Sequence, residues 1–150
     1  MQRLHKAITE IDVLCPPKIY IGKILKAICH NLGYRFATVI QVDNQGKGWM
    51  FASYNLPQDY PEKVNQTEAP VLSSPSGEAI QTGRVIVLHD ALSDPRLAPW
   101  RELLRPYNVK TIVWVPLLSK GHPFGTYVLY DTHIRDISEQ EKNYHESTKD

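Results

Sequence analysis

The chain has 150 residues, with 17 Lys and Arg against 16 Asp and Glu, which gives a formal net charge of +1. This length favours a single domain that buries a core without needing disulfides or a metal. The near-neutral charge argues against a basic nucleic-acid-binding protein, and the 42% content of hydrophobic residues argues against disorder.

Hydropathy and cysteine usage indicate a compartment. No stretch approaches the roughly 18 apolar residues of a membrane span, and charged residues interrupt the N-terminus where a signal peptide needs an apolar centre. Cys15 and Cys29 fit neither a CxxC motif nor a zinc-ligand spacing. We therefore expect a cytoplasmic protein with no membrane segment in this stretch.

The N-terminal region predicts two helices. Over residues 3–14 an apolar stripe recurs at +4, +3 and +4, the spacing of a coiled-coil seam. The stripe consists of Leu4, Ile8, Ile11 and Cys15. It fits a dimer seam, and it fits equally well a helix packed on its own domain. Pro16 and Pro17 end this helix and begin a second one, which Gly33 stops.

A hairpin and a long connection follow. Residues 35–42 are rich in β-branched and aromatic side chains, and residues 48–54 return as a second strand after the turn residues Asp43-Asn44-Gln45-Gly46. The segment 55–75 contains four prolines, so we expect a connection with at most short helical pieces. Long loops in compact domains are often functional.

The second half of the chain predicts a short helix at 76–82, a loop at 89–99 and a short helix at 100–105. Three further strands are predicted at residues 84–88, 110–118 and 124–131, the first of them buried on both faces. A final helix starts near Ile134. The element order predicts an α+β domain with a largely antiparallel central sheet and helices on its faces. We expect a linker or signalling helix at 1–15, the domain at 16–145 and a polar tail at 146–150.

Residues 84–130 carry a more specific pattern, in which an Asp-Pro-Arg loop, a Val-Pro-Leu strand end and a Phe-Gly strand start follow one another. The residues are Asp94-Pro95-Arg96, Trp100, Thr111, Val115-Pro116-Leu117 and Phe124-Gly125. With the helix at 17–33 and the hairpin at 35–54, this ordered set resembles the GAF domain, a small-molecule sensor module of signalling proteins. The resemblance covers residues 17–140.

The resemblance implies a PAS-related α+β fold with a six-stranded antiparallel sheet. The terminal helices would pack on one face, and loops and short helices would roof a pocket on the other. It also implies a non-enzymatic, regulatory role beside an output domain in the same or a partner protein, of the histidine kinase or cyclic-di-GMP enzyme type. The expected partners are a small-molecule ligand, whose identity the sequence does not give, and a second copy joined through terminal helices.

Family analogy, not periodicity, selects the strand faces that would form the pocket floor. The predicted ligand-binding residues are Phe51, His89, Asp94, Arg96, Trp100, Thr111, Val113, Val115, Val128 and Tyr130. On the other face, Trp114, Tyr127 and Leu129 are expected to pack under the terminal helices.

Each polar candidate has a structural alternative. His89 with Asp90 fits acid–base chemistry or haem ligation, but also a hydrogen bond to a loop carbonyl. Asp94 and Arg96 fit an anion site or the stabilisation of their own loop, and Trp100 fits a pocket roof or a packed core.

Specialised chemistries of the family are not expected. Cys29-His30 resembles the bilin-attachment pair, but it lies on the first helix of the domain, and neither Cys15 nor Cys29 lies in a pocket loop, as the methionine sulfoxide reductases of the family require. The Asn-Lys-Phe-Asp-Glu signature of cyclic-nucleotide-binding members is absent. Two other functions stay open: an interaction module whose pocket is filled by its own side chains, and a small enzyme that uses His89.

Overall fold

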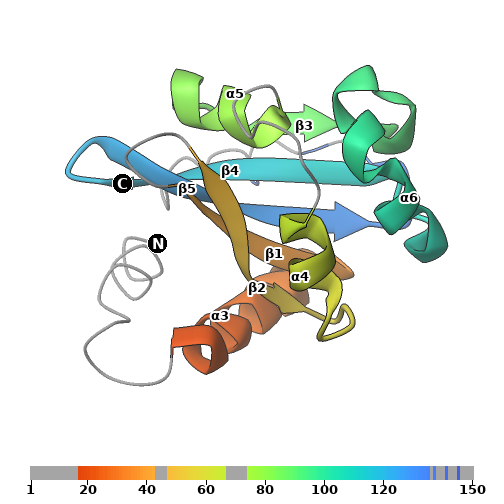
Figure 1. Cartoon of the computed structure of the whole chain (residues 1–150), viewed down its shortest axis with the longest axis horizontal. Helices are drawn as coiled ribbons and strands as arrows, with labels where there is room; N and C mark the ends of the chain where they lie inside the picture. The colour runs from red at the N-terminus through yellow and green to blue at the C-terminus, as the bar shows by residue number, and fades with distance from the viewer. Residues whose placement is uncertain are drawn as a thin grey trace.

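The computed structural model describes residues 17–42, 47–66, 74–135, 137, 141 and 145. At its centre lies an antiparallel sheet with the strand order β2-β1-β5-β4-β3 (Figure 1). The strands are β1 (Phe36–Val42), β2 (Gly48–Tyr54), β3 (Ile86–Leu88), β4 (Thr111–Ser119) and β5 (His122–Asp131). The predicted α+β class is confirmed, but the sheet has five strands in the described part of the chain instead of the expected six.

The β4–β5 hairpin forms the middle of the sheet. Ser119 pairs with His122, so the turn consists of Lys120 and Gly121, and both have positive φ (53° and 79°), as this kind of tight turn requires. Gly125 lies opposite Gln41 of β1, where an added Cβ would stand 2.2 Å from the Ile40 carbonyl oxygen. Only a residue without a Cβ fits this close approach of the two strand backbones.

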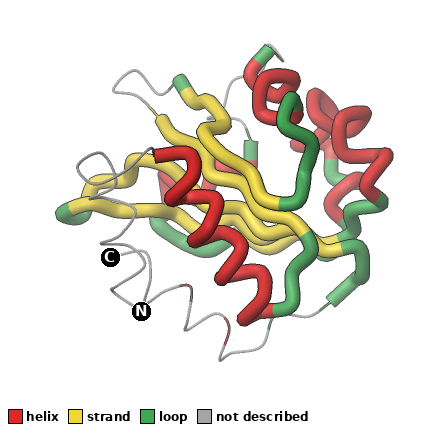
Figure 2. Tube along the Cα trace, turned by 90° about the horizontal axis from the view of Figure 1, so that it is seen from below, coloured by secondary structure: helices red, strands yellow, loops and turns green. Residues whose placement is uncertain are grey.

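Helix α3 (Pro17–Leu32) covers one face of the sheet, as Figure 2 shows from below. Its apolar stripe packs with inward side chains of β1, β2, β4 and β5. This core consists mainly of Ile21, Leu25, Ile28, Cys29, Val39, Val113, Val115, Tyr127 and Leu129. The helix stops at Gly33 (φ 78°), whose N–H donates to the Cys29 carbonyl at 2.8 Å, so the predicted stop is confirmed.

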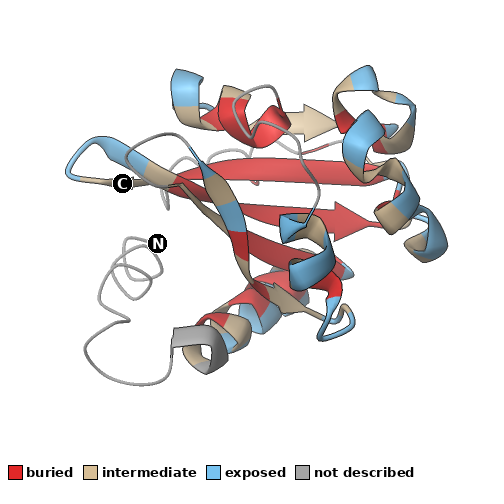
Figure 3. Cartoon of the chain, viewed as in Figure 1, coloured by how far each residue is buried: buried red, intermediate tan, exposed pale blue. Residues whose placement is uncertain are grey.

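Short helices cover the opposite face, and we call them together the roof. They are α4 (Tyr60–Asn65), α5 (Pro75–Thr82), α6 (Arg101–Leu104) and the 3-10 helices η2 (Ala91–Ser93), η3 (Pro95–Trp100) and η4 (Arg105–Tyr107). Ser74 caps α5 by accepting from the Gly77 N–H, and Asp94 caps η3 by accepting from the Arg96 N–H. Figure 3 shows β4 and β5 almost wholly buried between the two layers.

Strand β3 and the two ends of the chain differ from the expectations or fall outside the described residues. Burial of β3 on both faces is wrong, because β3 is an edge strand that pairs only with β4 and is half-buried along its length. The N-terminal seam residues lie outside the described residues, and of the expected final helix only isolated positions are described, among them Glu141 and His145. Within the described part, no helix has the length and apolar character of a membrane span.

Candidate functional site

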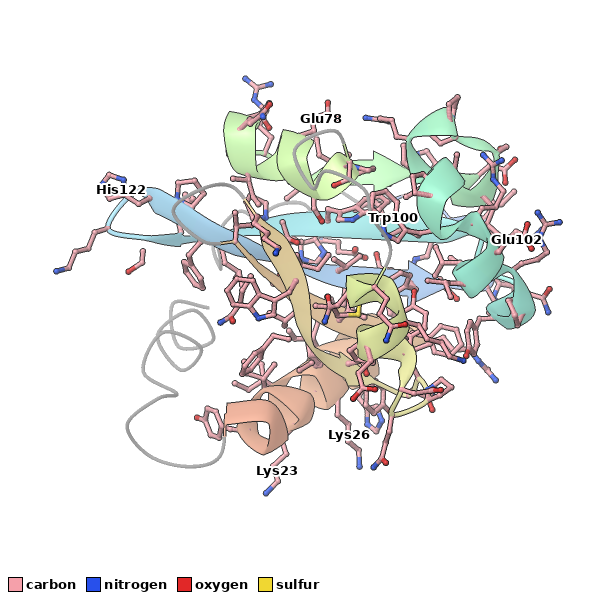
Figure 4. All side chains as sticks on the ribbon, in the orientation of Figure 1. Lys23, Lys26, Glu78, Trp100, Glu102 and His122 are labelled. Carbon is pink, nitrogen blue, oxygen red and sulfur yellow. The ribbon has the colours of Figure 1, made fainter. Side chains whose placement is uncertain are left out.

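A pocket of about 90 Å³ lies between the sheet and the roof. The strands contribute Ile40, Gly48, Trp49, Met50, Ile112, Trp114 and Tyr130. The roof contributes Tyr60, Val64, Asn65, Ser74, Pro75, Ser76, Leu97, Trp100 and Leu104. Figure 4 shows Trp100 where the roof meets the strands, whereas Lys23 and Lys26 point away from the sheet on α3.

Register decides which strand residues reach this pocket. Directly opposed residues of an antiparallel pair share a face, and Ile112 opposes Tyr130 while Trp114 opposes Val128. On β5, Tyr130 lines the pocket, and Val128 on the same face belongs to the core beneath the roof without lining the pocket.

The predicted face of β4 is wrong. Val113 and Val115 oppose Leu129 and Tyr127 and pack in the core under α3. Ile112 and Trp114 take their place on the pocket side, so the expectation that Trp114 packs under the terminal helices is wrong as well.

Thr111 and Phe51 also lie away from the pocket. Thr111 shares the Val113 face of β4 by alternation, and its hydroxyl donates to the His133 carbonyl at 2.8 Å. Phe51 packs against the α3 core, and its neighbour Met50 lines the pocket instead. Of the ten predicted residues, Trp100 and Tyr130 line the pocket.

His89 is exposed, and its Nδ1 lies 2.9 Å from the Arg135 carbonyl oxygen. This is the hydrogen bond to a loop carbonyl that the sequence left as the structural alternative. A ring held by a main-chain oxygen and outside the pocket lining is poorly placed for acid–base chemistry on a bound molecule.

Asp94 and Arg96 are engaged with each other. One carboxylate oxygen accepts from the Arg96 N–H at 2.9 Å and from Arg96 Nε at 3.1 Å, and Arg96 also pairs with Glu78 of α5. The hydrogen bonds from Arg96 lower the pKa of the Asp94 carboxyl. These groups join η3 to α5 and stabilise the roof, and neither lines the pocket.

Side-chain hydrogen bonds hold the pocket walls. Asn65 Oδ1 accepts from the Met50 N–H at 2.6 Å and Asn65 Nδ2 donates to the Met50 carbonyl at 3.1 Å, which joins α4 to β2. The Tyr130 hydroxyl lies 2.9 Å from Thr38 Oγ1. The wall positions are thus fixed from both the strand side and the helix side.

The Tyr60 hydroxyl and the Trp114 indole nitrogen lack such hydrogen bonds to the described residues. The side chains of Tyr60 and Trp114 are only 3% and 4% exposed, yet neither the Tyr60 hydroxyl nor the Trp114 indole N–H has a hydrogen-bond partner among the described residues. In that part of the chain, Arg101 Nε is the one fully enclosed side-chain nitrogen or oxygen without a partner. The Tyr60 hydroxyl and the Trp114 N–H are therefore not fully enclosed, and both residues line the pocket. Burial raises the pKa of Tyr60 well above its usual range, which keeps the hydroxyl protonated.

Reactive and metal-binding groups are scarce. Cys29 lies in the core under α3, on the face opposite the pocket, and burial raises the pKa of its thiol to about 12. Among the residues that the structure describes, no group of three His, Cys, Asp or Glu side chains could hold a metal ion.

The family model of the GAF domain matches residues 21–146. A methyl sulfide methyltransferase-associated sensor of Methanosarcina acetivorans is 26% identical over 109 residues, which are 71% of this chain and 11% of that protein. The chain therefore spans about a ninth of the length of this curated relative.

Solved structures share the fold. The GAF domain of a phosphoenolpyruvate-protein phosphotransferase of Coxiella burnetii superposes with a TM-score of 0.73 at 16% identity, covering 97% of this chain and 85% of that one. A domain of a two-component sensor histidine kinase protein of Sinorhizobium meliloti, described as putative, gives 0.66 at 15% identity over 89% and 85%. The free methionine-R-sulfoxide reductase of Neisseria meningitidis gives 0.67 at 14% identity over 96% and 80%.

Proposed function

The chain belongs to the GAF domain family, and from this premise we propose that it is the small-molecule-sensing, regulatory part of a signalling protein. The ligand binds in the pocket between the sheet and the roof and acts on an output domain in the same or a partner protein. The observation that carries this proposal is the pocket itself, which α4, α5, η3 and α6 of the roof help to line.

The relatives support the regulatory half of the proposal. The Methanosarcina protein is named as a sensor, and the Sinorhizobium domain comes from a sensor histidine kinase protein. We propose an output of the histidine kinase or cyclic-di-GMP enzyme type, a cytoplasmic location and a homodimer formed through terminal helices.

The role we propose is not enzymatic. His89 is exposed and lies outside the pocket lining, and Cys29 lies behind the sheet. The reductase of Neisseria shares the fold at 14% identity, which carries no activity over to this chain. The interaction-module alternative requires that Trp49, Trp100 and Tyr130 close the space between them, whereas all three border open volume.

The mechanism we propose is a population shift. A ligand that contacts both α4 and η3 favours the arrangement in which these roof elements are held against the sheet. The shift would reach the opposite face through β4 and β5, whose alternate side chains pack against the roof and against α3.

A thermal-shift screen of a metabolite library against the whole chain tests this function. We expect at least one compound that raises Tm in the native chain. The Val64→Trp variant, which fills the pocket from α4, should lose the shift, and Glu62→Trp on the exposed side of the same helix should keep it. A library that shifts neither the native chain nor Glu62→Trp would overturn the proposal, as would shifts that Val64→Trp retains.

A further inference from the structure

We propose that the pocket takes a small, uncharged, planar aromatic molecule that carries a hydrogen-bond acceptor. This inference rests on the proposed sensing function and names the class of ligand. It follows from four properties of the lining: its rings, its lack of charge, its unpaired donors and its size.

The lining is rich in aromatic rings. The chain has three tryptophans, and all three line the pocket together with Tyr60 and Tyr130. Within the described part of the chain, none of these five rings is paired with another of the five; Tyr60 makes an edge contact only with Tyr107, with centroids 6.0 Å apart. Ring faces and edges in a pocket of this kind favour offset or edge contacts with a flat aromatic guest.

No Asp, Glu, Lys, Arg or His stands among the described lining residues. In the roof, Arg96 pairs with both Asp94 and Glu78, and Arg101, which does not line the pocket, donates to the Asp94 carbonyl. A charged ligand would lose its hydration without gaining an ionic partner, and burial of an unpaired charge is costly. The pocket therefore favours an uncharged molecule.

The unpaired polar atoms specify an acceptor. An indole N–H only donates, so a guest that displaces water from the Trp114 N–H must offer an acceptor in its place. The Tyr60 hydroxyl also has a proton to donate. A carbonyl oxygen or a ring nitrogen on the ligand would pair with these groups, which have no partner among the described residues.

The volume limits the ligand to about one ring. The pocket measures about 90 Å³, less than the roughly 150 Å³ of an engineered protein cavity that binds benzene. The pocket is open on one side, which leaves room for one polar substituent on the ring of the ligand. Haem, bilins and nucleotides exceed this volume unless the roof separates from the sheet.

Tryptophan fluorescence provides a direct test, since all three indoles border the pocket. We would titrate the whole chain with benzamide, benzoate, benzylammonium, toluene, adenosine monophosphate and haemin, and confirm binding by calorimetry. Benzamide should bind with a Kd of about 1 mM or lower, and benzoate and benzylammonium at least about tenfold more weakly.

Two variants isolate the donors. Tyr60→Phe and Trp114→Phe keep a ring and lose the donor, so each should weaken benzamide binding by about three- to tenfold and leave toluene binding unchanged. Tyr107→Phe is the matched control, because Tyr107 packs beside Tyr60 but outside the lining, and it should bind benzamide like the native chain.

The outcomes separate this inference from the proposed function. If adenosine monophosphate, haemin or a charged probe binds more tightly than benzamide and Val64→Trp abolishes that binding, the pocket is a sensor site and the ligand class is wrong. If Tyr60→Phe and Trp114→Phe bind benzamide like the native chain, the assignment of the donors is overturned. If no probe and no library compound binds, both proposals fall.

Discussion

At the scale of single residues, Gly125 is a position where the backbone of β5 lies close to that of β1. A Cβ there would stand 2.2 Å from the Ile40 carbonyl oxygen, a backbone atom that cannot move without opening the β1–β5 ladder. We expect Gly125→Ala to lower the free energy of unfolding by at least about 2 kcal/mol, measured by urea denaturation.

Gly22→Ala is the matched control. Gly22 lies within α3, and an added Cβ meets nothing within 4 Å. The same change should therefore raise stability by about 0.5–1 kcal/mol, because glycine is unfavourable inside a helix. If both variants move the urea midpoint in the same direction, the contact at Gly125 is not what makes glycine necessary.

Glu141 is the second single residue with a large expected effect. Its carboxylate accepts from the Tyr34 hydroxyl, from His145 Nε2 at 3.0 Å and from Arg135 Nη2 at 3.3 Å. His145 is fully buried, and its Nδ1 lies 2.8 Å from the Tyr127 hydroxyl. The carboxylate thus joins Glu141 to Tyr34, two residues after the end of α3, and through His145 to Tyr127 of β5.

Stability should depend on pH through this carboxylate. Burial alone would raise the pKa of Glu141, but hydrogen bonds from His145 and Tyr34 and the charge of Arg135 hold it below its usual value. The stabilisation is therefore present above the unfolded pKa of about 4.3 and is lost as the pH falls through the lower folded pKa. Glu141→Gln should cost about 2–3 kcal/mol at neutral pH, and less as the solution is acidified. Urea midpoints from neutral pH down to about pH 3 measure this; a constant difference between variant and native chain would contradict it.

At the scale of elements, Asn65 joins α4 to the edge of the sheet. Its amide satisfies both the N–H and the carbonyl of Met50 on β2. We expect Asn65→Ala to cost about 1–2 kcal/mol and to speed hydrogen exchange of the Met50 amide more than that of amides in β4.

The neighbouring exposed residue provides the control. Gln66→Ala, at the end of the same helix, should leave exchange at Met50 unchanged. Equal exchange rates at Met50 in Asn65→Ala and the native chain would show that other contacts hold α4 in place.

Element by element, the sequence is informative where periodicity or turn chemistry is local. The stop of α3 at Gly33 and the hairpin between β1 and β2 follow from residues within a few positions of each other. Which face of β4 lines the pocket does not follow from nearby residues. Alternation divides the strand into two equivalent sets of side chains, and only the pairing with β5 shows which set lies on the pocket side. Family analogy placed Val113 and Tyr130 on one face, although Tyr130 opposes Ile112.

The roof explains the rest of what the sequence missed. Tyr60 and Asn65 come from the proline-containing connection, which the sequence marked as functional without indicating any residue in it. Helix α4 has only six residues, too few for an amphipathic pattern to show which side chains face inward. The sequence signal available for these two pocket residues was the presence of a tyrosine and an asparagine in a proline-rich segment.

At the scale of the whole molecule, one sheet supports two cores. Ile28 belongs to the core under α3, whereas all three tryptophans border the pocket on the roof side. Because β4 and β5 contribute side chains to both cores, we expect the described domain to unfold as one cooperative unit. Ile28→Ala removes fully buried methyl groups and should cost about 2–4 kcal/mol.

Probes on both faces of the sheet should report the same loss of stability in Ile28→Ala. Far-ultraviolet circular dichroism reports on all elements and tryptophan fluorescence on the roof side, and in Ile28→Ala both urea midpoints should fall by the same amount. Leu97→Ala, from the roof core, should give the same coincidence from the other side. If the fluorescence midpoint of Ile28→Ala stays at its native value, the two faces unfold separately. The sheet could then not carry a change in the pocket to α3, and the proposed signalling route would lose its physical basis.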